Sequence, residues 1–328
     1  MLKKNIINYL HRFDSLNKYF SGIATIFMLH RVSPFETDKL LPNENMKISP
    51  EFLEKIIIEL REKKYEFISL DRLSQILGNK EKVEKKIVFT LDDGYKDNYE
   101  LAYPVFKKYN VPFTIYITTS FPEKSAVLWW YVLEDLIIAN NQLTLSNGKK
   151  YICGTTQEKI NAFMEIREII ISFAPNEFLK KLNELFANYS VNWYKYSNVL
   201  TMSWEDIQKL SQDELVTIGG HTTNHFALNM LSKDEVVKEV LDANQLIELK
   251  TGKKVNHFSY PFGSRKEIGK REFDIIKSLN FKTSTTTRNG NIYYAHNGFM
   301  ECMPRVMLIE NFDIQELGNI RRKKVVTE

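Results

Sequence analysis

Short apolar runs alternate with longer amphipathic segments along most of the chain. Short apolar runs have the length of buried strands, whereas apolar residues three or four positions apart have the period of a helix. The run IATIFML at 23–29 predicts a strand, and a helical pattern begins at Pro50 and continues to 63. The same criteria predict strands at 67–70, 87–91, 113–118, 215–218, 257–260 and 282–286, and helices at 71–77, 98–109, 204–210, 232–249 and 271–279.

This alternation stops between about 120 and 200, where three helical patterns follow one another around 130–140, 157–173 and 176–188. The segment at about 121–200 is therefore predicted to be a helical insertion. On either side of it, alternating strands and helices favour parallel strands joined by crossover helices. The candidate site residues all follow strand ends, which favours an α/β barrel of about seven or eight strands over an open sheet.

Composition is that of a soluble globular protein, with 328 residues, 43% of them apolar and 26% charged. The net charge of +4 is too small to predict nucleic-acid binding through a broad positive field. The basic run at 321–324 reads as a solvated tail. Cys153 and Cys302 have no CxxC partner, so the sequence favours a reducing compartment and argues against a cysteine-based zinc site.

The N-terminal segment 1–22 has apolar residues near helical spacing, with Lys and Arg between them. It does not resemble a signal peptide, and no apolar stretch approaches the roughly 18 residues of a membrane span. We therefore expect a cytoplasmic protein. The N-terminal helix either packs on the protein's own core or makes a peripheral membrane contact.

Two acidic residues follow the predicted strand at 87–91, in the string TLDDG at 90–94. Asp-Gly is common in turns, so a strand-ending turn is the simple interpretation. However, adjacent carboxylates after a buried strand are costly unless something compensates their charge. A metal ion would neutralise Asp93 or Asp92 and leave the other as a general base.

A histidine pair follows the predicted strand at 215–218, in the string HTTNH at 221–225. The spacing of His221 and His225 fits one face of a helix or a structural pair, but the preceding Gly219-Gly220 favours a turn at a strand end. Two imidazoles and one carboxylate hold a divalent ion and leave positions open for water and substrate. If the two strings meet in space, the protein is a metal-dependent hydrolase.

Three further strings have both a structural and a functional interpretation. The string FSYPFG at 258–263 is either a strand ending in a turn or an aromatic wall that holds a sugar. His30, directly after the first predicted strand, is either a structural residue or part of the site. The cluster WWY at 129–131 either lines a substrate groove or belongs to a small helical core.

These strings resemble the motifs of a known family. TLDDG is similar to the TFDDG first motif of polysaccharide deacetylases (carbohydrate esterase family 4, the nodulation-deacetylase homology domain). HTTNH and YPFG are similar to the second and third motifs. The segment from Ile26 to Ser69 resembles the circularly permuted branch typified by poly-N-acetylglucosamine deacetylases. The resemblance implies an α/β fold with a distorted (β/α)7-type barrel over 23–328, interrupted by the insertion.

The resemblance also implies a role for each matching residue. Asp93, His221 and His225 would bind the metal, usually Zn2+, with Asp92 as general base and His30 as general acid. Substrate contacts are expected from Tyr95, whose backbone N–H would face the oxyanion, and from Tyr260, Pro261, Phe262 and Arg305.

The sequence departs from the family at two places. Ser259 stands where many members have arginine, and the usual Asp-Trp fourth motif is not evident near 282–287. We expect Arg305 to supply the missing cation beside Asp92.

The implied function is hydrolysis of an N-acetyl group on an amino sugar of a cell-surface polysaccharide or its precursor. The partner would be an N-acetylated saccharide rather than nucleic acid, and the oligomeric state is not predicted. One alternative is a deformylase or deacetylase of a lipid-linked or nucleotide-linked sugar. Another is a non-catalytic carbohydrate-binding protein on the same fold, which would be expected to have lost a key residue.

Overall fold

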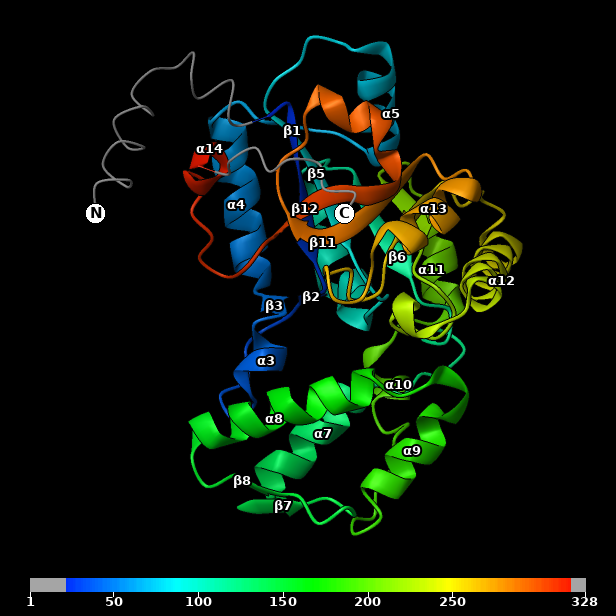
Figure 1. The fold of residues 1–328 in the computed structure, drawn as a ribbon. Helices are drawn as coiled ribbons and strands as arrows, with labels where there is room; N and C mark the ends of the chain where they lie inside the picture. Colours follow the sequence, from blue (N-terminus) through cyan, green and yellow to red (C-terminus); the bar gives the residue numbers. More distant parts are fainter. Residues whose placement is uncertain (1–21, 320–328) are drawn as a thin grey trace, which may run out of the picture.

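A closed barrel of parallel strands forms the centre of the computed structural model, which describes residues 22–319 (Figure 1). Within this part of the chain, seven strands form the barrel, and the last of them, β5, pairs again with β1. Their order is β1 (Ala24–Leu29), β12 (Met303–Met307), β11 (Thr283–Asn289), β10 (His257–Ser259), β9 (Val216–Gly220), β6 (Phe113–Ile117) and β5 (Lys86–Leu91). The predicted α/β barrel is confirmed. The predicted helix at 1–22, apart from Gly22, and the basic run at 321–324 lie outside the described residues.

Barrel strands such as β1, β5 and β6 are short apolar runs because both of their faces are buried. All residues of β1 and β6 are buried, as expected for parallel strands with side chains in the barrel on one face and helices on the other. Phe27 stacks on Phe89, and Phe106 stacks on Phe113 with ring centroids 4.4 Å apart. These rings join the strands to the surrounding helices in one core.

Helices follow most of the strands and surround the barrel (Figure 1). They are α4 (Pro50–Glu62), α5 (Leu70–Asn79), α6 (Tyr103–Lys108), α11 (Trp204–Ser211), α12 (Lys233–Thr251) and α13 (Lys270–Ser278). The predicted helix at 98–109 is divided, because a π-helical turn, η1 (Asn98–Ala102), precedes α6. Pro104 has no N–H and therefore lies in the first turn of α6.

Two predicted features near the sheet differ in the structure. The strand expected at 67–70 is the two-residue β4 (Glu66–Phe67), because the Ser69 hydroxyl accepts a hydrogen bond from the N–H of Arg72 and begins α5 at Leu70. The strand β12 was not predicted, because Pro304 and Arg305 interrupt its apolar pattern. β12 pairs with β1 and β11 and completes the barrel.

Residues 121–200 lie between β6 and β9 and include α7 (Trp129–Ala139), α8 (Thr156–Ile171), α9 (Phe178–Leu185) and α10 (Ser197–Leu200). The three longer helices match the predicted patterns. A short antiparallel hairpin of β7 (Gln142–Thr144) and β8 (Lys150–Ile152) was not predicted, because three-residue strands are too short to show alternation. Figure 1 shows α7, α8 and α9 grouped at one end of the barrel. They share a separate apolar core.

Two short segments follow the end of β1. β2 (Arg31–Val32) pairs with β3 (Lys47–Ile48), and α3 (Leu41–Glu44) lies between them. Within residues 22–319, no helix is both long and apolar enough to cross a bilayer.

Candidate active site

The residues singled out by the motifs lie where strands of the barrel end. Asp92 and Asp93 follow β5, His221 directly follows β9, and His30 directly follows β1. The carboxyl ends of parallel strands meet at one mouth of a barrel, where the connecting loops form a site. Gly219 and Gly220 belong to β9 itself rather than to the turn that the sequence suggested.

Asp93, His221 and His225 converge on one point. The Nε2 atoms of both histidines lie 3.2 Å from Oδ1 of Asp93. One candidate ligand atom from each residue lies within 4.8 Å of the others. Nδ1 of His221 lies 2.7 Å from the carbonyl oxygen of Ser259, and donation to that carbonyl would leave Nε2 free to bind a metal. The backbone carbonyl therefore orients this ring as in many metal sites.

Burial supports this reading of the three residues. Oδ1 of Asp93 is buried and receives no hydrogen bond of normal geometry from the residues that the structure describes. A buried carboxylate oxygen without a donor is costly, and a cation between it and the two imidazoles would remove that cost. The donor set of two imidazole nitrogens and one carboxylate fits a divalent ion such as Zn2+.

The backbone is strained at the same place. Asp93 has φ +78°, and Thr222, His225 and Phe262 have φ +66°, +59° and +59°. Residues other than glycine rarely adopt a positive φ. This conformation is least favourable for a β-branched residue such as Thr222. The hydroxyl of Thr222 accepts a hydrogen bond from the N–H of His225 and so holds the turn. Strain of this kind typically gathers at functional sites.

Charges within the cluster shift the pKa values of its members. Burial disfavours the charged form of Asp93, but the imidazoles of His225 and His221 outweigh it and hold its pKa well below the usual range. Burial also disfavours protonation of His221, but Asp93 and Asp92 raise its pKa above the ordinary value. The ionised carboxylate of Asp93 therefore favours a cation at this point.

Asp92 faces a different partner from Asp93. Arg305 donates from both terminal nitrogens to the two carboxylate oxygens of Asp92, each at 2.7 Å. Arg305 also donates to the hydroxyls of Thr90 and Ser259, each at 3.0 Å, and to the carbonyl of Thr286 at 2.9 Å. Burial disfavours the charged form of Asp92, but Arg305 outweighs burial and lowers its pKa.

Arg305 thus lies beside Asp92, as expected, but not at the surface of the site. Its side chain is fully buried and lies over the Tyr116 ring, with the guanidinium carbon 5.8 Å from the centroid. The expectation that it contacts substrate therefore does not fit its position. Ser259, which stands where the family often has arginine, lies between Arg305 and Asp92 and hydrogen-bonds with both.

His30 belongs to the same electrostatic cluster. Burial lowers the pKa of its imidazole, while the nearby Asp93 and Asp92 partly offset this effect. Nδ1 of His30 has no hydrogen-bond partner among the described residues. Its main-chain carbonyl accepts a hydrogen bond from the Asn98 side chain at 2.9 Å, which fixes the loop. The ring is thus held close to both carboxylates with an unsatisfied nitrogen.

The residues expected to contact substrate have different environments. Tyr260 is fully buried, and its hydroxyl donates to the carbonyl of Glu301 at 2.7 Å, so it belongs to the core rather than to a sugar-binding wall. Pro261 is also buried. Phe262 is partly exposed and lies against His225, with ring centroids 4.8 Å apart. Tyr95 is buried, and its hydroxyl accepts a hydrogen bond from the Trp130 indole at 3.2 Å.

Sequence reasoning missed a buried ion pair next to His30. Arg31 donates to Asp97 at 2.7 Å and to the hydroxyl of Tyr131 at 3.1 Å. The guanidinium carbon also lies 5.2 Å from the centre of the Tyr95 ring. These contacts join the loop after β1 to the insertion. Nothing in the sequence besides the position of Arg31 next to His30 pointed to them.

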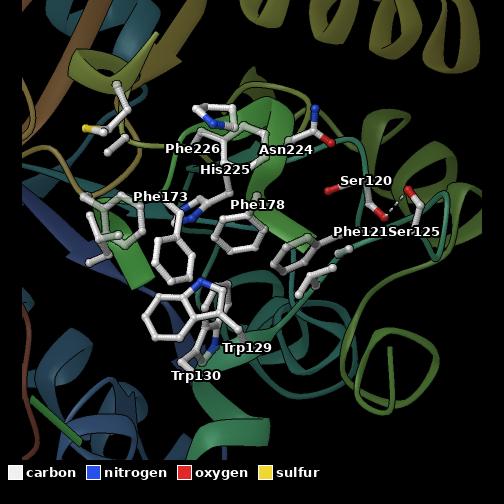
Figure 2. Close-up of a pocket in the computed structure, with 17 residues that line it drawn as sticks. Ser120, Phe121, Ser125, Trp129, Trp130, Phe173, Phe178, Asn224, His225 and Phe226 are labelled. Carbon is white, nitrogen blue, oxygen red and sulfur yellow. Dashed lines mark hydrogen bonds between the residues drawn. The ribbon is translucent and has the colours of Figure 1, made fainter. Parts of the chain in front are cut away.

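A pocket opens beside His225, between the barrel mouth and the insertion. It contains about 640 Å³ of space, counting its open side. Figure 2 shows the rings of Phe173 and Phe178 and the indole groups of Trp129 and Trp130 gathered around it, together with the imidazole of His225. The WWY cluster therefore contributes both to the pocket and to the insertion's core, because Trp129 belongs to both.

The fold and the site define a parallel α/β-barrel protein with a histidine–aspartate centre at the barrel mouth. The polysaccharide deacetylase family model matches residues 79–162 and 167–283, and the chain belongs to this family. The resemblance drawn from the motifs is thus confirmed. A stretch of 39 residues is 51% identical to YxkH of Bacillus subtilis strain 168, named as a polysaccharide deacetylase; it covers 12% of this chain and 14% of that relative.

Solved structures with similar folds include two that are named as deacetylases, PplD and BpsB. The Streptococcus pyogenes deacetylase PplD, in complex with acetate, has a TM-score of 0.62 at 17% identity, covering 92% of this chain and 98% of that one. IcaB from Ammonifex degensii has a TM-score of 0.55 at 16% identity, covering 90% and 94%. The BpsB deacetylase domain from Bordetella bronchiseptica has a TM-score of 0.52 at 13% identity, covering 87% and 95%. These similarities support the fold.

Proposed function

We propose that this protein is a metal-dependent hydrolase that removes the N-acetyl group from an amino sugar of a cell-surface polysaccharide or its precursor. The observation that carries the proposal is the convergence of Asp93, His221 and His225 at the barrel mouth, with the ionised Asp92 beside them. Membership of the polysaccharide deacetylase family supports the same chemistry.

Asp93, His221 and His225 would hold the ion, which we propose to be Zn2+. A divalent ion supplies Lewis acidity, which polarises an acyl carbonyl and makes water a stronger acid. The three protein ligands leave room for further ligands in such a site. This arrangement distinguishes a catalytic site from a closed structural one.

Asp92 would accept the proton of the attacking water. Arg305 donates to both carboxylate oxygens and Ser259 also donates to Oδ2, so the second lone pair of Oδ1 is the one available for the proton. Because Arg305 keeps the pKa of Asp92 low, the base is ionised over a wide pH range. The pair also fixes the orientation of the carboxylate.

His30 would donate a proton to the nitrogen of the departing amine, because an amide anion is too poor a leaving group to depart unaided. The C–N bond breaks as this proton is delivered, and the products are acetate and the free amino sugar. The backbone N–H of Tyr95 is proposed to stabilise the developing oxyanion.

Metal content and acetate release test the proposal directly. The full chain is treated with a chelator, reloaded with Zn2+ and incubated with N-acetylglucosamine oligosaccharides. We expect activity to depend on reloading. Asp93→Ala and His221→Ala should lose both bound metal and activity, because each removes a ligand.

His30→Gln provides the contrasting variant. It should retain the metal but release acetate about 10²- to 10⁴-fold more slowly, which is the usual range for loss of a general acid. Full activity in folded Asp93→Ala would exclude the assignment. Saccharide binding without acetate release by the metal-loaded chain would favour the non-catalytic alternative.

A further inference from the structure

The pocket beside His225 exists because the insertion covers one side of the barrel mouth. The loop after β6 and the start of α7 provide Phe121 and Trp130. The segment after α8 and the start of α9 provide Phe173 and Phe178. On the barrel side, the loop after β9 closes it with residues 224–227. Phe178 lies against Phe226, with ring centroids 5.4 Å apart, and so joins the two sides.

One ring belongs to both the pocket and the candidate metal site. His225 lines the pocket, while its Nε2 atom lies 3.2 Å from Asp93. The ring is flanked by Trp130 and Phe262, at centroid distances of 5.8 and 4.8 Å. A molecule held in the pocket would therefore lie next to the reacting group.

Most of the residues that line the pocket have apolar side chains. Among the described residues that form it, His225 is the only ionisable one, and Ser120, Ser125 and Asn224 are the other polar ones. The Asn224 side chain already donates to Glu239 at 2.6 Å. The Ser125 hydroxyl donates to the carbonyl of Ser120 at 3.5 Å. Few polar groups remain for a ligand.

This lining suits a hydrocarbon better than a sugar ring. Every hydroxyl of a buried sugar needs a hydrogen-bond partner, and an unsatisfied one weakens binding. An uncharged hydrocarbon chain needs none and gains from each methylene removed from water.

We propose that the pocket binds the hydrocarbon chain of a lipid-linked amino sugar while the N-acetyl group occupies the barrel mouth. This inference rests on the proposed deacetylase function and narrows its substrate class to a saccharide on an apolar carrier. The pocket then selects the carrier, and the metal site acts on the sugar.

A series of alkyl glycosides of N-acetylglucosamine tests this substrate class. Methyl, butyl, hexyl and octyl glycosides are compared below their micelle concentrations with the Zn2+-loaded full chain. We expect kcat/KM for acetate release to rise about fourfold per methylene until the pocket is full, which is the gain for moving a methylene out of water. The rise should come mainly from KM.

Phe178→Ala and Leu179→Ala form a matched pair for this series. Both residues lie on α9 and are partly buried, but only Phe178 lines the pocket. Phe178→Ala should flatten the dependence of kcat/KM on chain length, whereas Leu179→Ala should preserve it. Val127→Trp, which fills part of the pocket without removing a wall, should also weaken the octyl glycoside selectively.

Several outcomes would overturn the inference. Equal kcat/KM for methyl and octyl glycosides would refute binding of the hydrocarbon chain in the pocket, while leaving the deacetylase function intact. A gain from lengthening the N-acyl group, with none from the glycoside chain, would assign the pocket to the acyl group instead. A clear preference for soluble N-acetylglucosamine oligosaccharides over the octyl glycoside would favour a polymer substrate.

A different result is expected if the protein is not a deacetylase. If no glycoside releases acetate, binding of the octyl glycoside is followed by the fluorescence of Trp129 and Trp130, both of which line the pocket. Binding that grows with chain length and is lost in Phe178→Ala would keep the pocket assignment while rejecting the reaction. Absence of such binding would also reject the assignment of the pocket to a hydrocarbon chain.

Discussion

Asp92 and Asp93 are adjacent in the chain but face different partners. The positive φ of Asp93 turns the chain directly after Asp92, so the two side chains leave it in different directions. Asp92 therefore meets the buried Arg305, and Asp93, with its positive φ, meets His221 and His225. This geometry gives two chemically identical residues separate proposed roles, one as a base and one as a metal ligand.

At this scale, Arg305 should set the pH range in which Asp92 is ionised. Burial alone would raise the pKa of this carboxyl, and Arg305 outweighs burial. We expect Arg305→Met to raise the pKa and so move the acid limb of the kcat/KM profile for acetate release to higher pH. Arg305→Lys keeps the charge but not the two parallel N–H groups, so its shift should be smaller.

Loss of Arg305 also affects folding, because removing one partner of a buried ion pair typically costs about 3–5 kcal/mol. Thermal unfolding therefore accompanies each pH profile, and activity is scaled to the folded fraction. An unchanged acid limb in folded Arg305→Met would contradict the role assigned to the pair.

A glycine near the end of a barrel strand leaves room for side chains that support the site. Gly219, near the end of β9, lies against Tyr116 of β6; a Cβ at this position would be 2.5 Å from the ring. The Tyr116 ring in turn lies beneath Arg305. Glycine at this position thus allows β6 and β9 to pair while the support of Asp92 stays in place.

Gly219→Ala should therefore lower both stability and acetate release. Overpacking of this kind typically costs about 1–3 kcal/mol. The matched control is Gly78→Ala in α5, where a Cβ would have no neighbour within 4 Å. It should stabilise the protein by about 0.4–1 kcal/mol, because alanine reduces the freedom of the unfolded chain. Urea denaturation measures both, and equal effects of the two changes would contradict this account.

Among the apolar cores of residues 22–319, two belong to different parts of the molecule. One lies between the barrel and its helices, and the other joins α7, α8 and α9. Leu40, from the loop after β2, enters the second core, and its N–H donates to Glu134 of α7 at 2.8 Å. We propose that the insertion unfolds as a unit of its own on the barrel.

Phe163→Ala tests this proposal, because Phe163 is buried in the core of the insertion. Removing a buried phenyl group costs about 3–5 kcal/mol. Amide hydrogen exchange should become faster throughout α7, α8 and α9 and change much less in β1 and β5. Met164→Ala is the control, since the adjacent Met164 is 44% exposed. Equal acceleration in the barrel strands would show that the molecule unfolds as one unit.

The sequence predicted most barrel strands, several of them as short apolar runs, and it identified the metal-ligand candidates because polar residues directly follow such runs. It missed β12, whose Pro304 and Arg305 conceal a strand, and the hairpin of the insertion. It also assigned Tyr260 to a sugar-binding wall, although the residue is buried. Local patterns do not reveal which face of a turn becomes covered by a distant segment.

The sequence alone determined the fold class, the family resemblance and the strings that contain the candidate site, because these depend on local periodicity and on residues close together in the chain. Only the tertiary structure decided which residues meet. It placed Arg305 against Asp92, more than two hundred positions away, and the insertion's aromatic rings against His225. The physical reason is that barrel closure brings the ends of distant strands together, and this depends on packing over the whole chain.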